Sequence, residues 1–389
     1  MGVYANTVSI SQFRVLGELS REDRFTWLSS SLAKRCFNDI EQSAEELSEG
    51  WTRTDNPDDA DFVTPASCWR DRYLFFSYRR DQRRIPSALL KSHTGRAIGE
   101  YLAKRPELQR PPKQEREALA ERVKLSLLSR TLPVPVTVDL VWRLDSGILT
   151  VFSTSSKTIE RVEELFSKSF EHLRPQLIYP YSRARMVLDE AGNERLSAAS
   201  QSASDAALDE IRGNRWLGEE FLLWLLHGGL NGETYQICVA GHLRTADPFS
   251  AWIDDRIQLQ GGGEAGIQKV SVSGSQDRFV EALSALKSGK SISSATIHLE
   301  KDDLQWRFTL NAEMFTFGSF KCPTVKIERD GVEEISEREA AFYERMYLLE
   351  SGLQMFDSLL LMFLQQRLGD GWQQRMRVIE TWLVGDNNP

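Results

Sequence analysis

The sequence predicts an α+β fold that combines mixed and antiparallel sheets with helices and carries a basic helical-hairpin arm. Three observations lead to this prediction. Aromatic residues crowd residues 71–78, which favours a strand, and prolines bound two charged helical segments within residues 85–135. Residues from 336 onward follow a helical pattern. Hydrophobic residues at 41% and charged residues at 27% exclude a disordered chain.

The elements before the arm alternate between strand and helix. Residues 10–15 have the period of a strand. Residues 21–34 place Phe25, Leu28 and Leu32 near one face, as an amphipathic helix does. Residues 53–67 are rich in Asp and Pro and are predicted to form a loop.

The most basic part of the sequence is predicted to form two helices joined by a short turn. Pro86 suits the first turn of a helix that runs to about Lys104. Prolines then interrupt the chain, and a second helix covers about residues 113–129 and ends before Pro133.

The segments after the arm give a second set of elements. Residues 137–142 and 148–152 form a predicted strand pair joined by a turn, and residues 156–172 follow as a helix. Residues 189–213 are rich in Ala, Ser and Asp with few large apolar side chains, so the main linker is placed there.

The C-terminal half is predicted to be a separate α+β region. A helix covers residues 216–226, strands occupy 235–275 and 292–327 with a helix at 277–288, and helices cover 336–368 and 372–383. The apolar run at 359–364 is too dense for a surface helix, so the core or another subunit should cover it. The predicted division is a central domain of residues 1–78 with 131–188, the arm at 79–130, the linker at 189–213 and a base domain at 214–389.

The sequence indicates a protein that stays in the cytoplasm. Its start lacks the basic and apolar regions of a signal peptide, and its longest apolar run is six residues, far short of the roughly 20 that cross a bilayer. The four cysteines are scattered without a C-x-x-C pair, which favours buried thiols in a reducing compartment over a zinc or redox site.

The charge is unevenly distributed along the chain. Residues 72–130 contain 15 Lys/Arg and 6 Asp/Glu, a net charge of +9, whereas the remaining residues contain 33 and 50, a net charge of −17. An acidic body with one basic segment is typical of local contact with a polyanion. The alternative is a solvated helix face with internal pairs such as Lys113 with Glu117.

Two glycine motifs formally match nucleotide-binding patterns. Residues 261–266 fit G-x-G-x-x-G, but the following residues 267–272 are predicted as a strand, so a hairpin loop is favoured. Gly289-Lys290-Ser291 lacks the earlier glycine of a P-loop, since Ser284 occupies that place. Gly289 is therefore predicted to end a helix, and no cofactor is expected.

No set of residues in the sequence defines an enzyme. The doublets Asp254-Asp255 and Asp302-Asp303 are predicted to be turn and strand-end acids, because adjacent strand residues point to opposite faces. The histidines show no metal-binding spacing, and no nucleophile lies in a known elbow. The sequence therefore predicts neither catalytic residues nor a metal site.

The basic arm is the candidate site, with phosphate contacts expected and little direct reading of bases, since no recognition helix, zinc finger or RNA-binding aromatic signature is present. The candidate DNA contacts are Arg79, Arg80, Arg83, Arg84, Lys91, Lys104, Arg105, Arg110, Lys113, Arg116 and Lys124.

Several short motifs occur in a fixed order around the arm. They are Arg84-Ile85-Pro86, Leu89-Leu90-Lys91, Leu127-Leu128-Ser129-Arg130, Trp142, Gly147, Ser155-Ser156-Lys157 and Glu160. Weaker agreement is found at residues 13–16, Gly50-Trp51, Gly289-Lys290, residues 305–308 and Phe320-Lys321. In this order the chain resembles the RdgC family of recombination-associated proteins.

The resemblance implies a horseshoe-shaped subunit in a toroidal homodimer that encloses duplex DNA without reading its sequence and limits access of the recombinase RecA. It also implies association with the nucleoid. Two features depart from short family members: the tip carries Leu132-Pro133-Val134-Pro135 in place of phenylalanines, and the chain is longer. The residues expected at the dimer interface are Leu132, Pro133, Val134, Trp216, Phe221, Trp224, Phe356 and Phe363.

The resulting hypothesis is a non-enzymatic protein that binds DNA without sequence preference. Two alternatives are open. The first is an interaction scaffold in recombination or phage defence, in which DNA contact is secondary. The second is a metal-dependent nuclease that uses acids such as Asp254 and Asp302.

Overall fold

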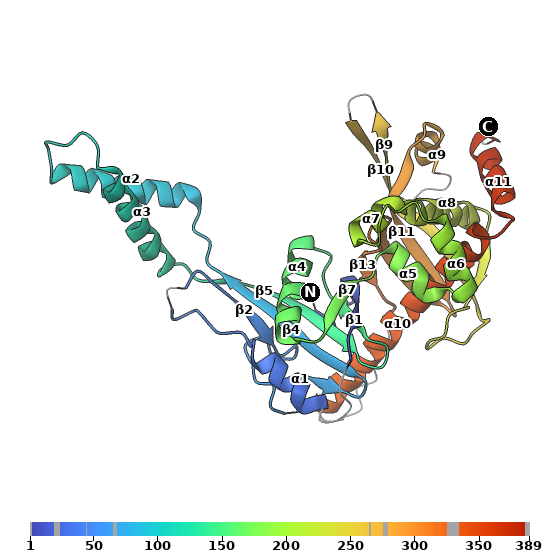
Figure 1. The fold of residues 1–389 in the computed structure, drawn as a ribbon, viewed down its shortest axis with the longest axis horizontal. Coiled ribbons are helices and arrows are strands. Elements are labelled where there is room, and N and C mark those ends of the chain that lie inside the picture. The colour runs from blue at the N-terminus through green and yellow to red at the C-terminus, as the bar shows by residue number, and fades with distance from the viewer. Residues whose placement is uncertain are drawn as a thin grey trace. The chain divides into compact units, whose positions relative to one another are not determined.

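The chain forms two compact units of mixed α and β structure, which confirms the predicted fold class. The computed structural model describes residues 2–18, 24–43, 45–64, 68–263, 266–274, 279–324 and 334–385 (Figure 1). Unit 1 contains residues 1–15, 148–159 and 175–389, and unit 2 contains residues 16–147 and 160–174. The division differs from the predicted domains, because the first strand belongs with the C-terminal half.

Unit 2 is built on an antiparallel sheet. Its strands are β2 (Leu47–Thr52), β3 (Trp69–Arg70), β4 (Tyr73–Gln82) and β5 (Val134–Arg143), with β4 between β2 and β5. The predicted strand at 71–78 corresponds to β4. Helix α1 (Arg24–Ala33) matches the predicted amphipathic helix, whose residues 21–23 lie outside the described ranges.

The core of unit 2 is aromatic. Trp142 of β5 meets Phe166 and Phe170 at 5.4 and 5.7 Å between ring centroids. Phe166 belongs to α4 (Ser156–Ser169), and the Trp51 indole N–H donates to the Ser169 hydroxyl at 2.8 Å. These contacts hold the C-terminal part of α4 on the sheet and fix the strands from which the arm leaves.

The sheet strands of unit 1 are hydrogen-bonded in the order β10-β9-β11-β12-β13-β1-β6. The strands are β1 (Thr7–Leu16), β6 (Ile148–Val151), β7 (Arg174–Leu177), β8 (Thr234–Gln236), β9 (Pro248–Gly263), β10 (Gly266–Ser273), β11 (Ser291–Lys301), β12 (Leu304–Asn311) and β13 (Phe317–Lys321). Strand β7 pairs with β1, and β8 pairs with β9.

Helices surround this sheet and include a long buried one. They are α5 (Pro180–Val187), α6 (Glu190–Ala199), α7 (Ala207–Gly213), α8 (Trp216–Leu230), α9 (Val280–Lys287), α10 (Glu334–Arg367) and α11 (Trp372–Gly385). Residues 189–213, predicted as a linker, instead form α6 and α7. The side chain of Asp189 accepts from the Gly192 N–H and starts α6.

Helices α8 and α10 form an aromatic core that corrects part of the predicted dimer interface. The Phe221 ring lies 5.7 Å from Phe356 and 5.6 Å from Phe363, and Trp224 lies 5.4 Å from Tyr235. These residues are inaccessible within a single chain. Phe221, Trp224, Phe356 and Phe363 are therefore core residues, because an amphipathic pattern reveals that a face is covered but not what covers it.

Helix α10 is long and apolar enough to cross a membrane by length and composition alone. Most of its apolar window is buried inside unit 1, as in the core helix of a globular protein. This burial accounts for the apolar run at 359–364.

The predicted helix end at Gly289 and the predicted strand at residues 267–272 are confirmed. Gly289 has φ of +82° just after α9, and its N–H donates to the Leu286 carbonyl while the Lys290 N–H reaches Ala285. This pair of bonds is a Schellman motif at a helix end. The glycines at 261–263 and 266 lie on the paired strands β9 and β10, and residues 264–265 fall outside the described ranges.

The second acidic doublet has the predicted place in a turn. Asp302 and Asp303 both have positive φ and join β11 to β12 as a two-residue hairpin turn. None of the four cysteines, which all lie within the described residues, forms a disulfide. Burial raises the pKa of the Cys322 thiol to about 11, which keeps it protonated and unreactive.

Candidate nucleic-acid interface

The basic arm is a hairpin of two helices, as predicted. Helix α2 (Ser87–Ala103) begins after Pro86, and α3 (Lys113–Leu128) begins after Pro112. Proline suits these starts because it fixes φ and lacks an N–H that the first helical turn would leave unbonded. The two helices lie side by side (Figure 1).

The arm, defined here as residues 84–130, has almost no core of its own. Helix α2 contains no buried residue, and in α3 only Leu127 and Leu128 at the base are buried. Leu90, Ile98 and Val123 are partly covered. Most of the arm surface is therefore available to a ligand.

Arg83, at the base of the arm, is a structural residue and not a DNA contact. Its side chain is 2% exposed and donates to six backbone carbonyls. The acceptors are the carbonyls of Ile40, Glu41, Ser43, Glu45, Leu128 and Thr131. The prediction for Arg83 is therefore wrong, since none of its donors remains for a phosphate.

Arg79 and Arg80 are also largely withdrawn from the surface. Arg79 is 12% exposed, forms two hydrogen bonds with the Asp81 carboxylate at 2.8 Å and pairs with Asp58. The hydrogen bonds to Asp81, followed by those to Asp58, raise the pKa of the Arg79 guanidinium. Arg80 lies 3.7 Å from Glu49 and is equally buried. Both are removed from the candidate contacts, because carboxylates already neutralise or face them.

The remaining candidates lie on the arm and, with one exception, are exposed. The exposed residues are Arg84, Lys91, Lys104, Arg105, Arg110, Lys113 and Arg116. Within the described ranges none of these seven forms a salt bridge. Lys124 is the exception: it pairs with Glu46 at 2.9 Å, and this hydrogen bond raises the pKa of its ammonium group.

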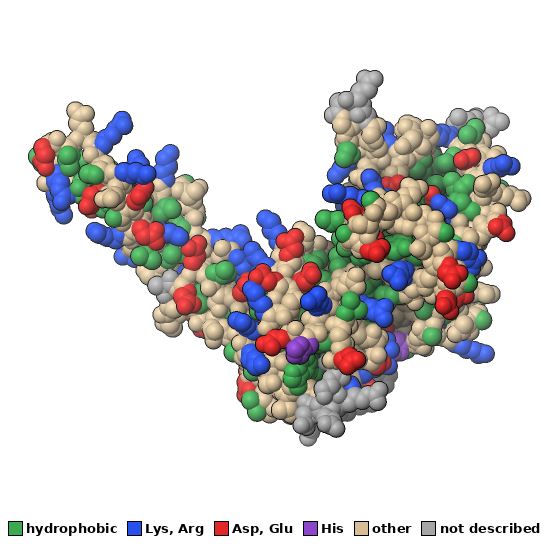
Figure 2. Space-filling view, viewed as in Figure 1, with side chains coloured by type: hydrophobic (Ala, Val, Ile, Leu, Met, Phe, Trp, Pro, Cys, Tyr) green, Lys and Arg blue, Asp and Glu red, His purple; other side chains and the backbone are tan. Residues whose placement is uncertain are grey.

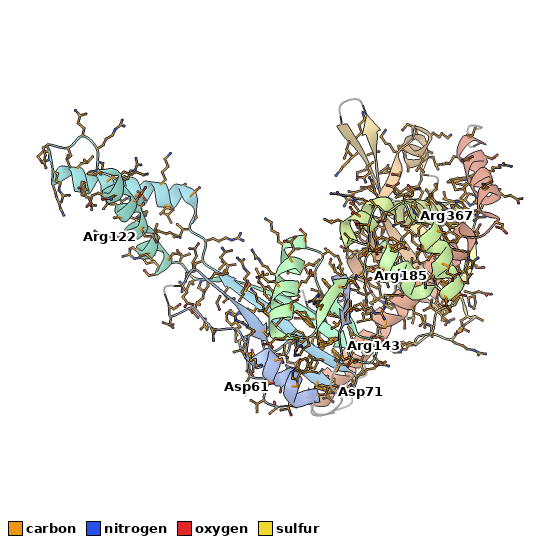
Figure 3. The ribbon with its side chains drawn as sticks, in the orientation of Figure 1. Asp61, Asp71, Arg122, Arg143, Arg185 and Arg367 are labelled. Carbon is orange, nitrogen blue, oxygen red and sulfur yellow. The ribbon has the colours of Figure 1, made fainter. Side chains whose placement is uncertain are left out.

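Three exposed basic residues of the arm were not chosen from the sequence. Arg96, Arg122 and Arg130 are exposed, and Figure 3 labels Arg122 on α3. All three contribute to the excess charge of residues 72–130. The whole arm contains eleven Lys/Arg and five Asp/Glu, a net charge of +6.

The basic side chains are spread over both helices rather than gathered in one stripe. Figure 2 shows Lys and Arg along the arm with Asp and Glu between them. Such a distribution provides a positive field around the hairpin, but no regular row of donors that would match a series of base edges. The arrangement favours contact with phosphates.

An apolar group lies where the arm meets the sheet. Leu132 and Val134 are 69% and 59% exposed, Val136 is also exposed, and Pro133 is half-buried. Val134 and Val136 pair with Gln82 and Arg80 of β4, so they lie on one face of the sheet. Of the residues expected at a dimer interface, Leu132 and Val134 are thus accessible. Trp216 is half-buried under the Arg367 guanidinium, 4.5 Å from its ring.

The acidic residues of the nuclease alternative have other partners. The Asp255 carboxylate lies 3.1 Å from both the His298 ring and the Arg307 guanidinium, and Asp302 pairs with Lys301. In the described part of the chain, no group of three or more His, Cys, Asp or Glu residues is placed to hold a metal ion. Asp254 and Asp302 are therefore not joined in a metal centre there.

These features define a two-unit α+β protein with a solvent-covered basic helical hairpin inserted between two strands of one sheet. The model of the RdgC family, described as "Putative exonuclease, RdgC", matches residues 9–190. Over these residues, which include the whole arm and make up just under half of the chain, the protein is similar to the RdgC family. This similarity supports a recombination-related role. A search of curated proteins finds no significant match.

Proposed function

We propose that this protein binds duplex DNA without sequence preference through the basic arm and has no enzymatic activity. The observation that supports the proposal most is the set of seven exposed candidate cations on the arm that lack a salt-bridge partner among the described residues. Basic side chains without an internal carboxylate partner can take phosphates as counterions, which releases the condensed ions of DNA. Arg side chains add bidentate geometry at individual phosphates.

The proposal includes a homodimer that encircles DNA and modulates homologous recombination by limiting the access of RecA to DNA. The protein would be cytoplasmic and associated with the nucleoid. The exposed apolar group at Leu132, Val134 and Val136 supports a protein contact beside the arm. Phosphate contacts inside a ring would give affinity without specificity.

The direct test neutralises four exposed cations around the turn between α2 and α3. The variant replaces Lys104, Arg105, Arg110 and Lys113 with Gln. Binding to two unrelated duplexes of equal length is measured by fluorescence anisotropy across several salt concentrations. We expect equal weakening on both duplexes and a salt dependence that flattens by up to about 0.9 log unit per lost phosphate contact.

A matched control removes the same charge from unit 1. It replaces the exposed residues Arg195, Arg212, Lys287 and Arg377 with Gln. The control should retain the wild-type salt dependence. If both variants lose affinity equally, the effect belongs to net charge, and the arm is not the binding surface.

Encirclement has its own readout. Wild-type protein is loaded on closed circular and linear duplexes at low salt and then exposed to high salt. A closed ring should remain on the circle and slide from linear ends. Equal release from both forms contradicts encirclement but leaves phosphate binding by the arm intact.

The absence of enzymatic activity is tested by incubating end-labelled DNA with Mg²⁺ or Mn²⁺. We expect intact DNA. Cleavage that Asp254→Asn or Asp302→Asn abolishes would replace the proposal with the nuclease alternative.

A further inference from the structure

Unit 1 contains a polar pocket that the proposed DNA contact does not use. It has a volume of about 520 Å³, and its walls come from β1, β7 and the helices α5, α6 and α7. This volume falls within the range of small-molecule sites, roughly 300–1,000 Å³. The pockets beside α8 and beside α10 are smaller, at about 190 and 210 Å³.

Two arginines supply the positive side of the pocket. Arg14 extends from β1 and Arg185 from α5, and both are exposed and line the pocket. Figure 3 labels Arg185. Neither guanidinium forms a salt bridge within the described residues, in contrast to Arg183 of the same helix, which pairs with Asp357 at 2.6 Å. Two unpaired guanidinium groups in one pocket suit an anion that can accept from both.

A fixed polar wall faces the same space. Tyr179 is 2% exposed, and its hydroxyl donates to the Glu210 carboxylate. Burial first, and then this hydrogen bond, raises the pKa of the phenol. The tyrosine is therefore neutral, and its hydroxyl hydrogen is directed to Glu210. This bond joins α7 to the start of α5 and gives the pocket a rigid side.

The wall also contains a hydrogen-bond acceptor that nothing in the described residues satisfies. The Asn193 amide nitrogen donates to the carbonyls of Arg185 and Leu188, each at 3.2 Å. Its carbonyl oxygen Oδ1 is buried without a partner among the described residues. A buried acceptor of this kind is unfavourable unless a donor reaches it. Asp205, exposed at the rim, offers a further acceptor.

We propose that this pocket binds a phosphorylated, hydroxyl-bearing small molecule of mononucleotide size. The phosphate would take Arg14 and Arg185 as its cations, and ligand N–H or O–H groups would donate to Asn193 and Asp205. The side chains of Tyr181 and Met186 supply apolar contact for a ring. A purely apolar ligand would leave these polar groups without partners, so it does not fit.

Calorimetric titration of the full chain with adenosine 5′-monophosphate tests the proposal. Adenosine and inorganic phosphate serve as probes of each half of the ligand. We expect saturable binding of the nucleotide and at least about ten-fold weaker binding of either half, because each lacks one set of hydrogen bonds. Arg14→Gln and Arg185→Gln should each weaken nucleotide binding at least about ten-fold.

Two controls separate this pocket from other cations of the chain. Arg195→Gln changes an exposed arginine of α6 outside the pocket, and the four-residue arm variant removes cations in unit 2; both should bind the nucleotide as wild type does. Unchanged melting temperatures show that Arg14→Gln and Arg185→Gln remain folded. Absence of saturable binding, equal binding of phosphate alone, or loss in the arm variant but not in Arg185→Gln would each overturn the inference.

Discussion

At the end of β4 the arginine side chains belong to the interior, whereas on α2 and α3 the basic side chains lie in solvent. Arg83 donates to six carbonyls and Arg79 to two carboxylates. Three exposed residues of the arm have no salt bridge within the described ranges: Arg84, which follows Arg83 in the chain, Arg110 and Lys113. Neighbouring arginines in a sequence can therefore have different roles. Those that the fold surrounds with carbonyls or carboxylates are structural, and the others stay accessible to a ligand.

The largest expected effect comes from replacing the buried Arg83. Arg83→Met removes the donors for six carbonyls gathered from two separate segments. Because buried acceptors are then left unsatisfied, we expect the free energy of unfolding of unit 2 to fall by about 3–5 kcal/mol. Urea unfolding followed by tryptophan fluorescence measures the change. The neighbouring variant Arg84→Met should alter stability by less than about 0.5 kcal/mol, and similar losses for both would contradict the division.

A smaller effect, on the salt dependence of DNA binding, is expected from replacing one exposed arginine of the arm. Arg110→Gln should flatten the salt dependence of DNA binding by about 0.9 if this side chain contacts one phosphate. Arg79→Gln should leave the salt dependence unchanged, since Asp58 and Asp81 already neutralise that guanidinium. The same anisotropy titration reports both. A flatter dependence for Arg79→Gln alone would place the DNA at the strand end instead of the arm.

The smallest expected effect concerns His227, whose buried ring nitrogen Nδ1 has no hydrogen-bond partner among the described residues. Burial first, and then Arg375, lowers the pKa of His227, while Glu233 opposes this shift. The ring also meets the edge of Trp382 at 5.2 Å. Because the folded state binds this proton less well than the unfolded state, stability should decline as the pH falls below about 6.5, the usual pKa of histidine. His227→Gln should reduce that decline between pH 7 and pH 5 in thermal unfolding. An equally steep decline in the variant would assign it to other groups.

Local chemistry made much of the fold predictable. Prolines bounded both arm helices, Gly289 ended α9, and Asp302 and Asp303 formed a turn, because each of these preferences acts within a few residues. Helices α6 and α7 were missed because their small polar residues give little apolar periodicity. The core position of Phe356 was not separable from an interface position, since sequence density shows only that a helix is covered.

The candidate site was predictable in position but not residue by residue. The excess charge identified the arm, and seven of the candidate residues on it are exposed. The burial of Arg83 depends on carbonyls near residues 40–45 and 128–131, which local patterns do not connect. The polar pocket in unit 1 was missed for the same reason, because Arg14 and Arg185 come from distant parts of the chain.

The carbonyl bonds of Arg83 also have a consequence for how the arm can vary. This side chain precedes the arm in the chain, yet it also binds Leu128 and Thr131, where the chain returns from the arm to the sheet. The two points where the arm enters and leaves the sheet are thus tied together independently of the helices between them. Insertions, deletions or substitutions nearer the turn can therefore accumulate without shifting the register of β4 and β5, so the arm can diversify in reach and charge while the sheet that carries it stays the same.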